Sequence, residues 1–433
     1  MSALTGDILP PGEIELYVQH VAPTKLEELG SALWFESHHR LQKLYQQSII
    51  EANEMREETV KDVIISLGKV PVLIHEAVCI QVWREKIFRQ IIKTDQQPES
   101  TFIAYIILYH EMTAVGLLQN ILYHKDSIGS LEDSVLDLID YCSAEIIRLL
   151  AEDYTKPDKS STEVSNLEEI QIQCKTIGFN IGLSAISILR YITEYKDDLT
   201  LSAVSRLYTT HDVPMLMTNL IQMAPWKRIN HRTNIVQIYV DGTWKNIDKI
   251  QGIPKTEAQC WIALRYLLLD PKVGQQYEMT EFRKQSFVKV LKHLHETVID
   301  QISPLIDLKQ YLLQLSVTNV GNQCTKPLIM ETIPEIKSKI LSEGFKKWNK
   351  IAEKHINVIF NCSKGNMLEI AKRLGETYEI DHLERMAPEG PVCSNCGDAA
   401  AKRCSQCKAE WYCGRECQVK RWSMHKTVCN VQK

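Results

Sequence analysis

The sequence predicts a mainly α-helical protein, with a helical body over residues 1–387 and a separate small module at residues 393–429. Two observations lead to this prediction: apolar residues recur at helical spacing through the body, and cysteines crowd together near the C-terminal end. The 433 residues are enough for two or three domains, and 44% hydrophobic with 24% charged residues is an ordinary globular composition. A disordered or fibrous protein is therefore excluded.

Helical periodicity defines the elements of the body. Within Val60–Leu67, for example, apolar side chains recur at i, i+3, i+4 and i+7. Cys260–Leu264 is apolar nearly all round, which is typical of a helix buried inside a helical body. Thr256 followed by Gln259 fits a capping box, so we expect a helix to start there. The predicted helices cover residues 24–53, 57–67, 71–93, 101–125, 131–151, 167–195, 199–209, 214–224, 256–270, 279–300, 302–316, 335–360 and 364–386.

Two joints between predicted helices share one local pattern. Val-Pro followed by three apolar residues occurs at Pro71 and again at Pro214. Proline is well tolerated in the first turn of a helix, because its missing N–H would have had no partner there. Armadillo- or HEAT-type solenoids often turn from one helix into the next in this way. Two instances set no period, so the body is predicted to be either solenoid-like or an irregular helical domain.

Two segments interrupt the helical pattern. Residues 151–166 are polar without periodicity, which predicts a mobile surface loop. Within residues 234–247, β-prone runs flank Asp241-Gly242, which is a strong signal for a β-hairpin. We interpret this hairpin as a structural addition between helices.

No pattern in the body indicates catalysis. Neither phosphate-binding glycine motif occurs, and Ser184 lacks the closing glycine of a nucleophile elbow. His293 and His295 point about 200° apart on a helix and cannot hold one metal together. Lysines at residues 337–354 accompany an apolar stripe that includes Phe345; we interpret them as a solvated face, with a surface for an acidic partner as the alternative. We expect no enzymatic activity and no catalytic residue.

Charge and hydropathy exclude further classes. The net charge of −4 argues against a strongly basic, nucleic-acid-binding protein. The longest apolar run, at Phe102–Tyr109, is far shorter than the ~20 residues of a membrane span. The N-terminal residues show no secretory signal, so we expect reduced thiols. Residues 391–433 hold 8 Lys/Arg against 3 Asp/Glu, formally +5, which leaves 42 against 51, formally −9, for residues 1–390.

The thirteen cysteines fall into two groups. Six are scattered over the body and are expected to be ordinary buried thiols. The other seven join one histidine in four pairs of potential metal ligands: Cys393 and Cys396, Cys404 and Cys407, Cys413 and Cys417, His425 and Cys429. An x2 spacing presents both sulfurs to one ion, and an x3 spacing places two ligands one helical turn apart. Eight ligands predict two closed tetrahedral sites, with two Zn²⁺ as cofactors and no open position for catalysis.

The module depends on this metal, because a segment so short has too few apolar residues to fold unaided. Spacing alone leaves open whether the ligand pairs combine sequentially or in an interleaved order.

The order of these pairs, together with Trp411-Tyr412-Cys413 and Cys417-Gln418, closely resembles the MYND-type zinc finger. In that family the two sites are interleaved. The resemblance therefore implies one zinc on Cys393, Cys396, Cys413 and Cys417, and another on Cys404, Cys407, His425 and Cys429. MYND fingers dock peptides, which implies peptide-binding roles for Gln418 and Trp422. A core position covering the zinc sites is the alternative interpretation of Trp422.

The whole chain, body and finger together, resembles one group of MYND-finger proteins. Matching segments are spread over most of the length: residues 68–71, Asp133–Cys142, Leu189–Thr193, Gln259–Leu264 and Glu416–Lys420. The resemblance implies a non-enzymatic adaptor or co-chaperone-like factor for cytoplasmic pre-assembly of inner and outer axonemal dynein arms, required for motile cilia. It implies a leucine-rich-repeat assembly factor, chaperones and dynein chains as partners.

The expected localisation is the cytoplasm, including centrosomes, centriolar satellites and dynein assembly particles. A nuclear MYND-type transcriptional corepressor is the alternative. A lysine methyltransferase is disfavoured, because in such enzymes the finger is inserted within a catalytic domain rich in short strands.

Overall fold

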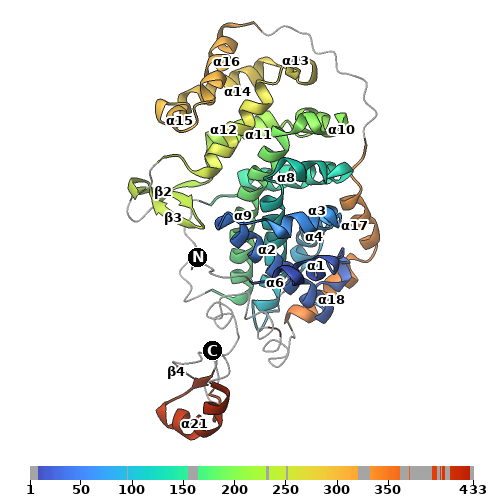
Figure 1. Ribbon diagram of the computed structural model, residues 1–433, viewed down its shortest axis with the longest axis vertical. Coiled ribbons are helices and arrows are strands. Elements are labelled where there is room, and N and C mark those ends of the chain that lie inside the picture. Colours follow the sequence, from blue (N-terminus) through green and yellow to red (C-terminus); the bar gives the residue numbers. More distant parts are fainter. Residues whose placement is uncertain are drawn as a thin grey trace.

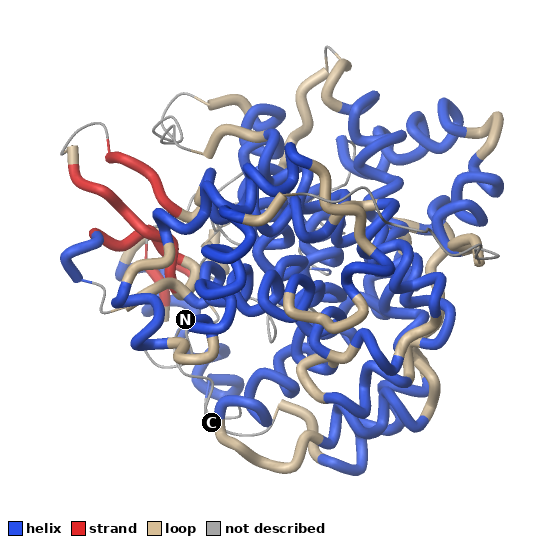
Figure 2. Tube along the Cα trace, turned by 90° about the horizontal axis from the view of Figure 1, so that it is seen from above, coloured by secondary structure: helices blue, strands red, loops and turns tan. Residues whose placement is uncertain are grey.

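The computed structural model describes residues 8–94, 96–154, 164–230, 234–249, 252–319, 332–360, 370, 393–396, 400, 402–404 and 410–429. Nearly all described elements of the body are helices (Figures 1 and 2), which confirms the predicted fold class. The helices are α1 (Pro11–Gln19), α2 (Ala32–Asn53), α3 (Thr59–Ser66), α4 (Val70–Trp83), α5 (Arg89–Ile91), α6 (Phe102–Ile121), α7 (Lys125–Gly129), α8 (Val135–Ala151), α9 (Asn166–Glu194), α10 (Leu201–Ser205), α11 (Val213–Met223), α12 (Lys255–Leu268), α13 (Val273–Gln276), α14 (Glu281–Lys289), α15 (Glu296–Gln301), α16 (Leu305–Val317), α17 (Ile336–Gly344) and α18 (Trp348–Phe360).

Some helix starts follow from local sequence. Pro71 and Pro214 occupy the first turns of α4 and α11, as predicted. Ser165 begins α9 with a capping box to Glu168, after the polar segment whose residues 155–163 lie outside the described residues. The predicted capping box at Thr256 is wrong: α12 begins at Lys255 after a proline, with no side-chain cap.

Three predicted helices are broken. Residues 24–53 divide into a 3₁₀ turn at Leu26–Glu28 and α2. Residues 279–300 divide into α14, a 3₁₀ turn at Val290–His293 and α15. Residues 335–360 divide into α17 and α18, because Lys346 adopts a positive φ of 66° that no helix tolerates. This turn directs the Phe345 side chain outward, where 66% of it is exposed. The prediction that Phe345 belongs to a buried stripe is therefore wrong. The helix predicted at residues 364–386 lies outside the described residues, apart from helical Ile370.

The helices stack along the long axis of the body around one continuous apolar core (Figure 1). Successive layers pack in the order α4 on α6, α6 on α9, α9 on α12 and α12 on α16. The chain then returns, so that α17 packs on α4 and α18 packs on α6. In a simple solenoid each repeat contacts only its neighbours. The return of α17 and α18 makes this body more complex than such a solenoid.

Polar contacts hold the returning helices in place. Asp137 of α8 accepts hydrogen bonds from the backbone N–H groups of Glu335, Ile336 and Lys337, which begin α17. The Lys337 ammonium lies 3.0 Å from the Glu85 carboxylate and donates a hydrogen bond to Gln81 at 3.0 Å, so this lysine joins two segments of the body and does not belong to a solvated face. These contacts join residues some 200 positions apart (Asp137 and Lys337).

A buried ion-pair cluster ties α4, α6 and α8 together. Arg84, directly after α4, bonds both Glu111 of α6 and Glu145 of α8, at 2.6 and 2.7 Å. Tyr141 donates a further hydrogen bond to Glu111 at 2.8 Å. Attraction to both carboxylates outweighs desolvation and raises the pKa of Arg84, so the guanidinium stays charged inside the core.

Two core helices, α6 and α9, are long and apolar enough to cross a membrane by length and composition alone, each with a mean hydropathy of 1.3. The bent pair Thr59–Ser66 and Val70–Ile91 passes the same test together, with an angle of 94°. The apolar window is 78% buried in α6 and 61% buried in α9, against other helices of the body. Packing against other helices therefore accounts for the high hydropathy of α6 and α9. The uninterrupted apolar run at Phe102–Tyr109 is too short to show this hydropathy by itself.

A small antiparallel sheet projects from the stack. Its strands are β1 (Lys227–Asn230), β2 (Ile235–Val240) and β3 (Thr243–Asn246), in the order β1-β2-β3. Asp241-Gly242 forms the β2–β3 turn, and both residues have positive φ. Phe179 of α9 packs against Tyr239 and Trp244, with ring centroids 4.9 and 5.8 Å apart, which fixes the sheet to the helical stack.

The body cysteines form no metal cluster among the described residues. Cys79, Cys142 and Cys260 are buried and Cys174 is partly buried. Cys324 and Cys362 lie outside the described residues.

Candidate metal centre

Two short strands and one helix make up the regular structure in the described part of the C-terminal module. Strands β4 (Lys402–Arg403) and β5 (Trp411–Tyr412) pair antiparallel, and helix α21 (Arg415–Cys429) follows. Cys393, Cys404, Cys429 and Tyr412 form a small core that shares no residue with the core of the body. Each described candidate ligand lies next to a strand, in or beside a turn, or on α21, where a short segment of backbone fixes its direction.

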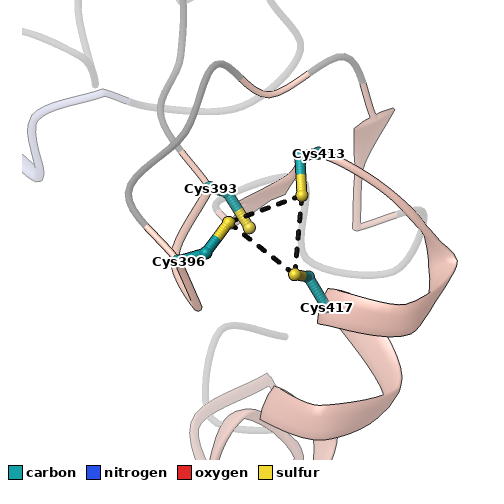
Figure 3. A group of neighbouring side chains, drawn as sticks. All are labelled: Cys393, Cys396, Cys413 and Cys417. Atoms are coloured by element: carbon teal, nitrogen blue, oxygen red, sulfur yellow. Dashed lines mark hydrogen bonds between the residues drawn. The ribbon is translucent and has the colours of Figure 1, made fainter.

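The first cluster combines Cys393, Cys396, Cys413 and Cys417. The first two come from the segment before β4, Cys413 directly follows β5, and Cys417 lies in the first turn of α21. Figure 3 shows their sulfur atoms converging. The Sγ of Cys396 lies 3.5 Å from that of Cys413 and 3.7 Å from that of Cys417.

The second cluster combines Cys404, His425 and Cys429. Cys404 directly follows β4, and the other two lie one turn apart near the end of α21. All three are buried, and the Sγ atoms of Cys404 and Cys429 are 3.9 Å apart. Cys407, the fourth ligand that the sequence predicts here, lies outside the described residues.

These distances fit zinc. Four ligands about 2.3 Å from one ion at the corners of a tetrahedron lie about 3.8 Å from one another. The measured Sγ–Sγ distances of 3.5–3.9 Å match this spacing and are far longer than a disulfide bond of about 2.05 Å. With thiolate and imidazole ligands, the two clusters are consistent with two zinc ions, as predicted. The ligand pairs are interleaved along the chain.

The electrostatics of the first cluster also call for a cation. Desolvation raises the pKa of Cys393, but backbone N–H groups of Cys413, Asn395 and Cys396 outweigh it and lower that pKa to about 6. The pKa of Cys413 is raised, chiefly by its contact with Cys417. Thiolates brought this close repel one another, so a positive ion that joins them stabilises the cluster. The Asn395 side chain donates a hydrogen bond to the Cys417 sulfur at 3.3 Å.

The predicted peptide-binding residues lie on α21, outside both clusters. Gln418 is partly buried, and Trp422 is 37% exposed. The Trp422 ring also contacts the ring of His425, with centroids 5.7 Å apart. Trp422 thus covers the second cluster with one side and presents the other to solvent. Both interpretations of this residue are compatible with its position.

Sequence reasoning missed one residue beside the ligands. Glu410 lies next to His425 and is considered below. Glu410 is not part of any of the four ligand pairs. The only sequence feature that could have pointed to it is its position two residues before Tyr412.

Comparisons with known proteins agree with this geometry. Residues 393–429 match the family model of the MYND finger. Over 38 residues the chain is 49% identical to mouse Tudor domain-containing protein 1, covering 9% of this chain and 3% of that protein. Over 51 residues it is 47% identical to dauer abnormal formation protein 25 of Caenorhabditis elegans, covering 12% of this chain and 13% of that protein. Such short matches cannot cover the helical body.

A different relative covers the body as well. The chain is 35% identical over 449 aligned residues to the zinc finger MYND domain-containing protein 10 homolog of Drosophila melanogaster, covering 97% of this chain and 98% of that protein. No solved structure matches the chain. Similarity over both body and finger shows that the chain belongs to the family of zinc finger MYND domain-containing protein 10.

Proposed function

We propose that this protein is a non-enzymatic adaptor that docks partner proteins through its MYND finger and serves the cytoplasmic pre-assembly of inner and outer axonemal dynein arms. The observation that carries the proposal is the similarity to a MYND-finger relative over nearly the whole of both chains. The four thiols of the first cluster support a role without catalysis, because they leave a zinc ion no open position. The dynein role rests on the resemblance of the body segments alone.

One face of α21 supports the docking role. Arg415, Val419, Trp422 and Lys426 follow one another at i, i+4, i+7 and i+11, so they form a stripe along the helix. Val419 is 66% exposed and Trp422 is 37% exposed, whereas the charged ends of the stripe are both exposed. An apolar centre between two cations fits an extended peptide that carries an apolar side chain near an acidic residue.

The test is affinity purification of the tagged full-length chain from ciliating cells. Gln418→Ala combined with Trp422→Ala should reduce recovery of a leucine-rich-repeat assembly factor or of chaperones, while the zinc content stays at two ions per chain. Met424→Ala is the matched control, because Met424 is 64% exposed on the opposite side of α21. Unchanged recovery with the double variant would assign Trp422 to the core and refute docking at this stripe.

Localisation provides an independent test of the assembly role. The tagged protein should be cytoplasmic, with enrichment at centriolar satellites or dynein assembly particles. A nuclear protein bound to chromatin regulators would refute the dynein role and favour the corepressor.

A further inference from the structure

Glu410 connects two ligands of the second cluster. Its backbone carbonyl accepts a hydrogen bond from the N–H of Cys404 at 2.8 Å. Its carboxylate oxygen Oε2 accepts a hydrogen bond from the Tyr412 hydroxyl at 2.6 Å and lies 3.2 Å from Nδ1 of His425. Tyr412 is itself buried in the module's core, so the carboxylate is held from a fixed point.

A neutral imidazole that binds a metal through one nitrogen carries its proton on the other. A buried N–H needs an acceptor, and a carboxylate is a strong one. The Glu410 carboxylate at Nδ1 therefore favours the tautomer with the proton on Nδ1, which leaves the Nε2 lone pair for the metal. The rings of Tyr412 and Trp422 both lie edge-on to the imidazole, with centroids 6.3 and 5.7 Å away, and restrict its rotation.

We propose that Glu410 is the positioning residue of the second metal cluster: when zinc binds, its carboxylate accepts the Nδ1–H of His425 and directs Nε2 toward the metal, and its backbone anchors Cys404. The described contacts of Glu410 are with Cys404, Tyr412 and His425, and with none of the four thiols of the first cluster. Zinc retention at the second cluster should therefore depend on the Glu410 side chain, whereas retention at the first cluster should not. The proposal concerns the metal alone and does not depend on the docking function.

Zinc retention in the full-length chain provides the first test. Zinc-loaded wild type, Glu410→Ala and Glu410→Gln are titrated with a chelator, zinc ions per chain are counted by native mass spectrometry, and alkylated cysteines are mapped. Glu410→Ala should release one zinc at about 10- to 100-fold lower chelator concentration, the usual effect of losing such a carboxylate. Cys404 and Cys429 should become reactive at that step, while the thiols of the first cluster stay protected.

Glu410→Gln keeps an acceptor oxygen for the imidazole N–H and should restore part of the retention. Tyr412→Phe, which removes only the hydroxyl that holds the carboxylate, should cause a smaller loss than Glu410→Ala. Equal zinc release by wild type and Glu410→Ala would overturn the proposal. Loss of both ions together would also overturn it, because the side chain would then support the finger as a whole.

The tautomer provides a readout that a purely structural role would not change. In zinc-loaded chain labelled with ¹⁵N-histidine, the His425 resonances are those missing from a His425→Cys variant. They should show a protonated Nδ1 and a metal-bound Nε2, and the Nδ1 proton should exchange faster with water in Glu410→Ala. A metal-bound Nδ1 would refute the proposed orientation, whatever the zinc affinity.

Discussion

His355 should make the stability of the helical body depend on pH, because it lies buried where α18 packs against the end of α4. This residue of α18 is buried, and its Nδ1 accepts a hydrogen bond at 3.0 Å from Nε1 of Trp83, at the end of α4. Desolvation, and secondarily the nearby Lys354 ammonium, lower the pKa of His355 from 6.5 to about 4. Protonation would also destroy the acceptor that Trp83 uses. We therefore predict that His355→Gln reduces the loss of body stability at acid pH.

The sign and size follow from linkage. Because the pKa is lower in the folded than in the unfolded protein, the unfolded chain takes up the proton first. The stability that His355 contributes is therefore fully present above its unfolded pKa of 6.5 and declines as pH falls toward about 4. Between about pH 8 and about pH 5, wild type should lose about 2 kcal/mol more than the variant.

The measurement is urea unfolding of both proteins across this range, followed by far-UV circular dichroism, which reports the helical body. Glutamine keeps an acceptor for the Trp83 N–H but does not titrate, so the pH-dependent difference isolates the imidazole. The two stability curves should run nearly parallel between about pH 8 and about pH 7 and diverge below. Parallel curves down to about pH 5 would refute the argument that burial disfavours the charged imidazole.

Other predictions concern the metal and the packing of the helices. Removal of zinc with a chelator should unfold residues 393–429 but retain most of the helical circular dichroism, because the two cores share no residue; loss of the body signal would contradict this independence. Cys404→Ala should leave one zinc per chain by mass spectrometry and the body intact. Arg84→Met would leave Glu111 buried without its ion-pair partner, whereas Glu145 would keep Arg148, and should cost about 3–5 kcal/mol in denaturant unfolding. Asp137→Ala removes the acceptor at the start of α17 and should cost about 1 kcal/mol. Its effect should appear as faster amide exchange in α17, and unchanged exchange would show that packing alone holds this helix.

The sequence predicts the helices of the body better than their arrangement. In a segment such as Val60–Ile64, the spacing of the apolar residues identifies the buried face of the helix. Such a helix can be predicted from its own residues, without knowledge of the rest of the chain. The contact of Asp137 with the start of α17 depends on two segments some 200 residues apart, and neither segment marks the other. Breaks are equally hard to foresee: the positive φ at Lys346 falls on a residue type that gives no turn signal.

The arrangement of the finger is easier to predict than that of the body. Here the ligand spacing and the length of one helix together restrict which ligands can share a zinc ion. Residues 415–429 form the single helix α21. At a rise of 1.5 Å per residue, Cys417 and His425 are about 12 Å apart along its axis. Ligands of one tetrahedral zinc lie only about 3.8 Å apart. A single ion cannot therefore bind both ends of α21, which excludes sequential pairing. Of the two remaining orders, the clustering of Cys413 and Cys417 with Cys393 and Cys396 selects the interleaved one. Each cluster fastens one end of the helix to the segment around β4 and β5, so loss of either ion should release that end while the other stays attached.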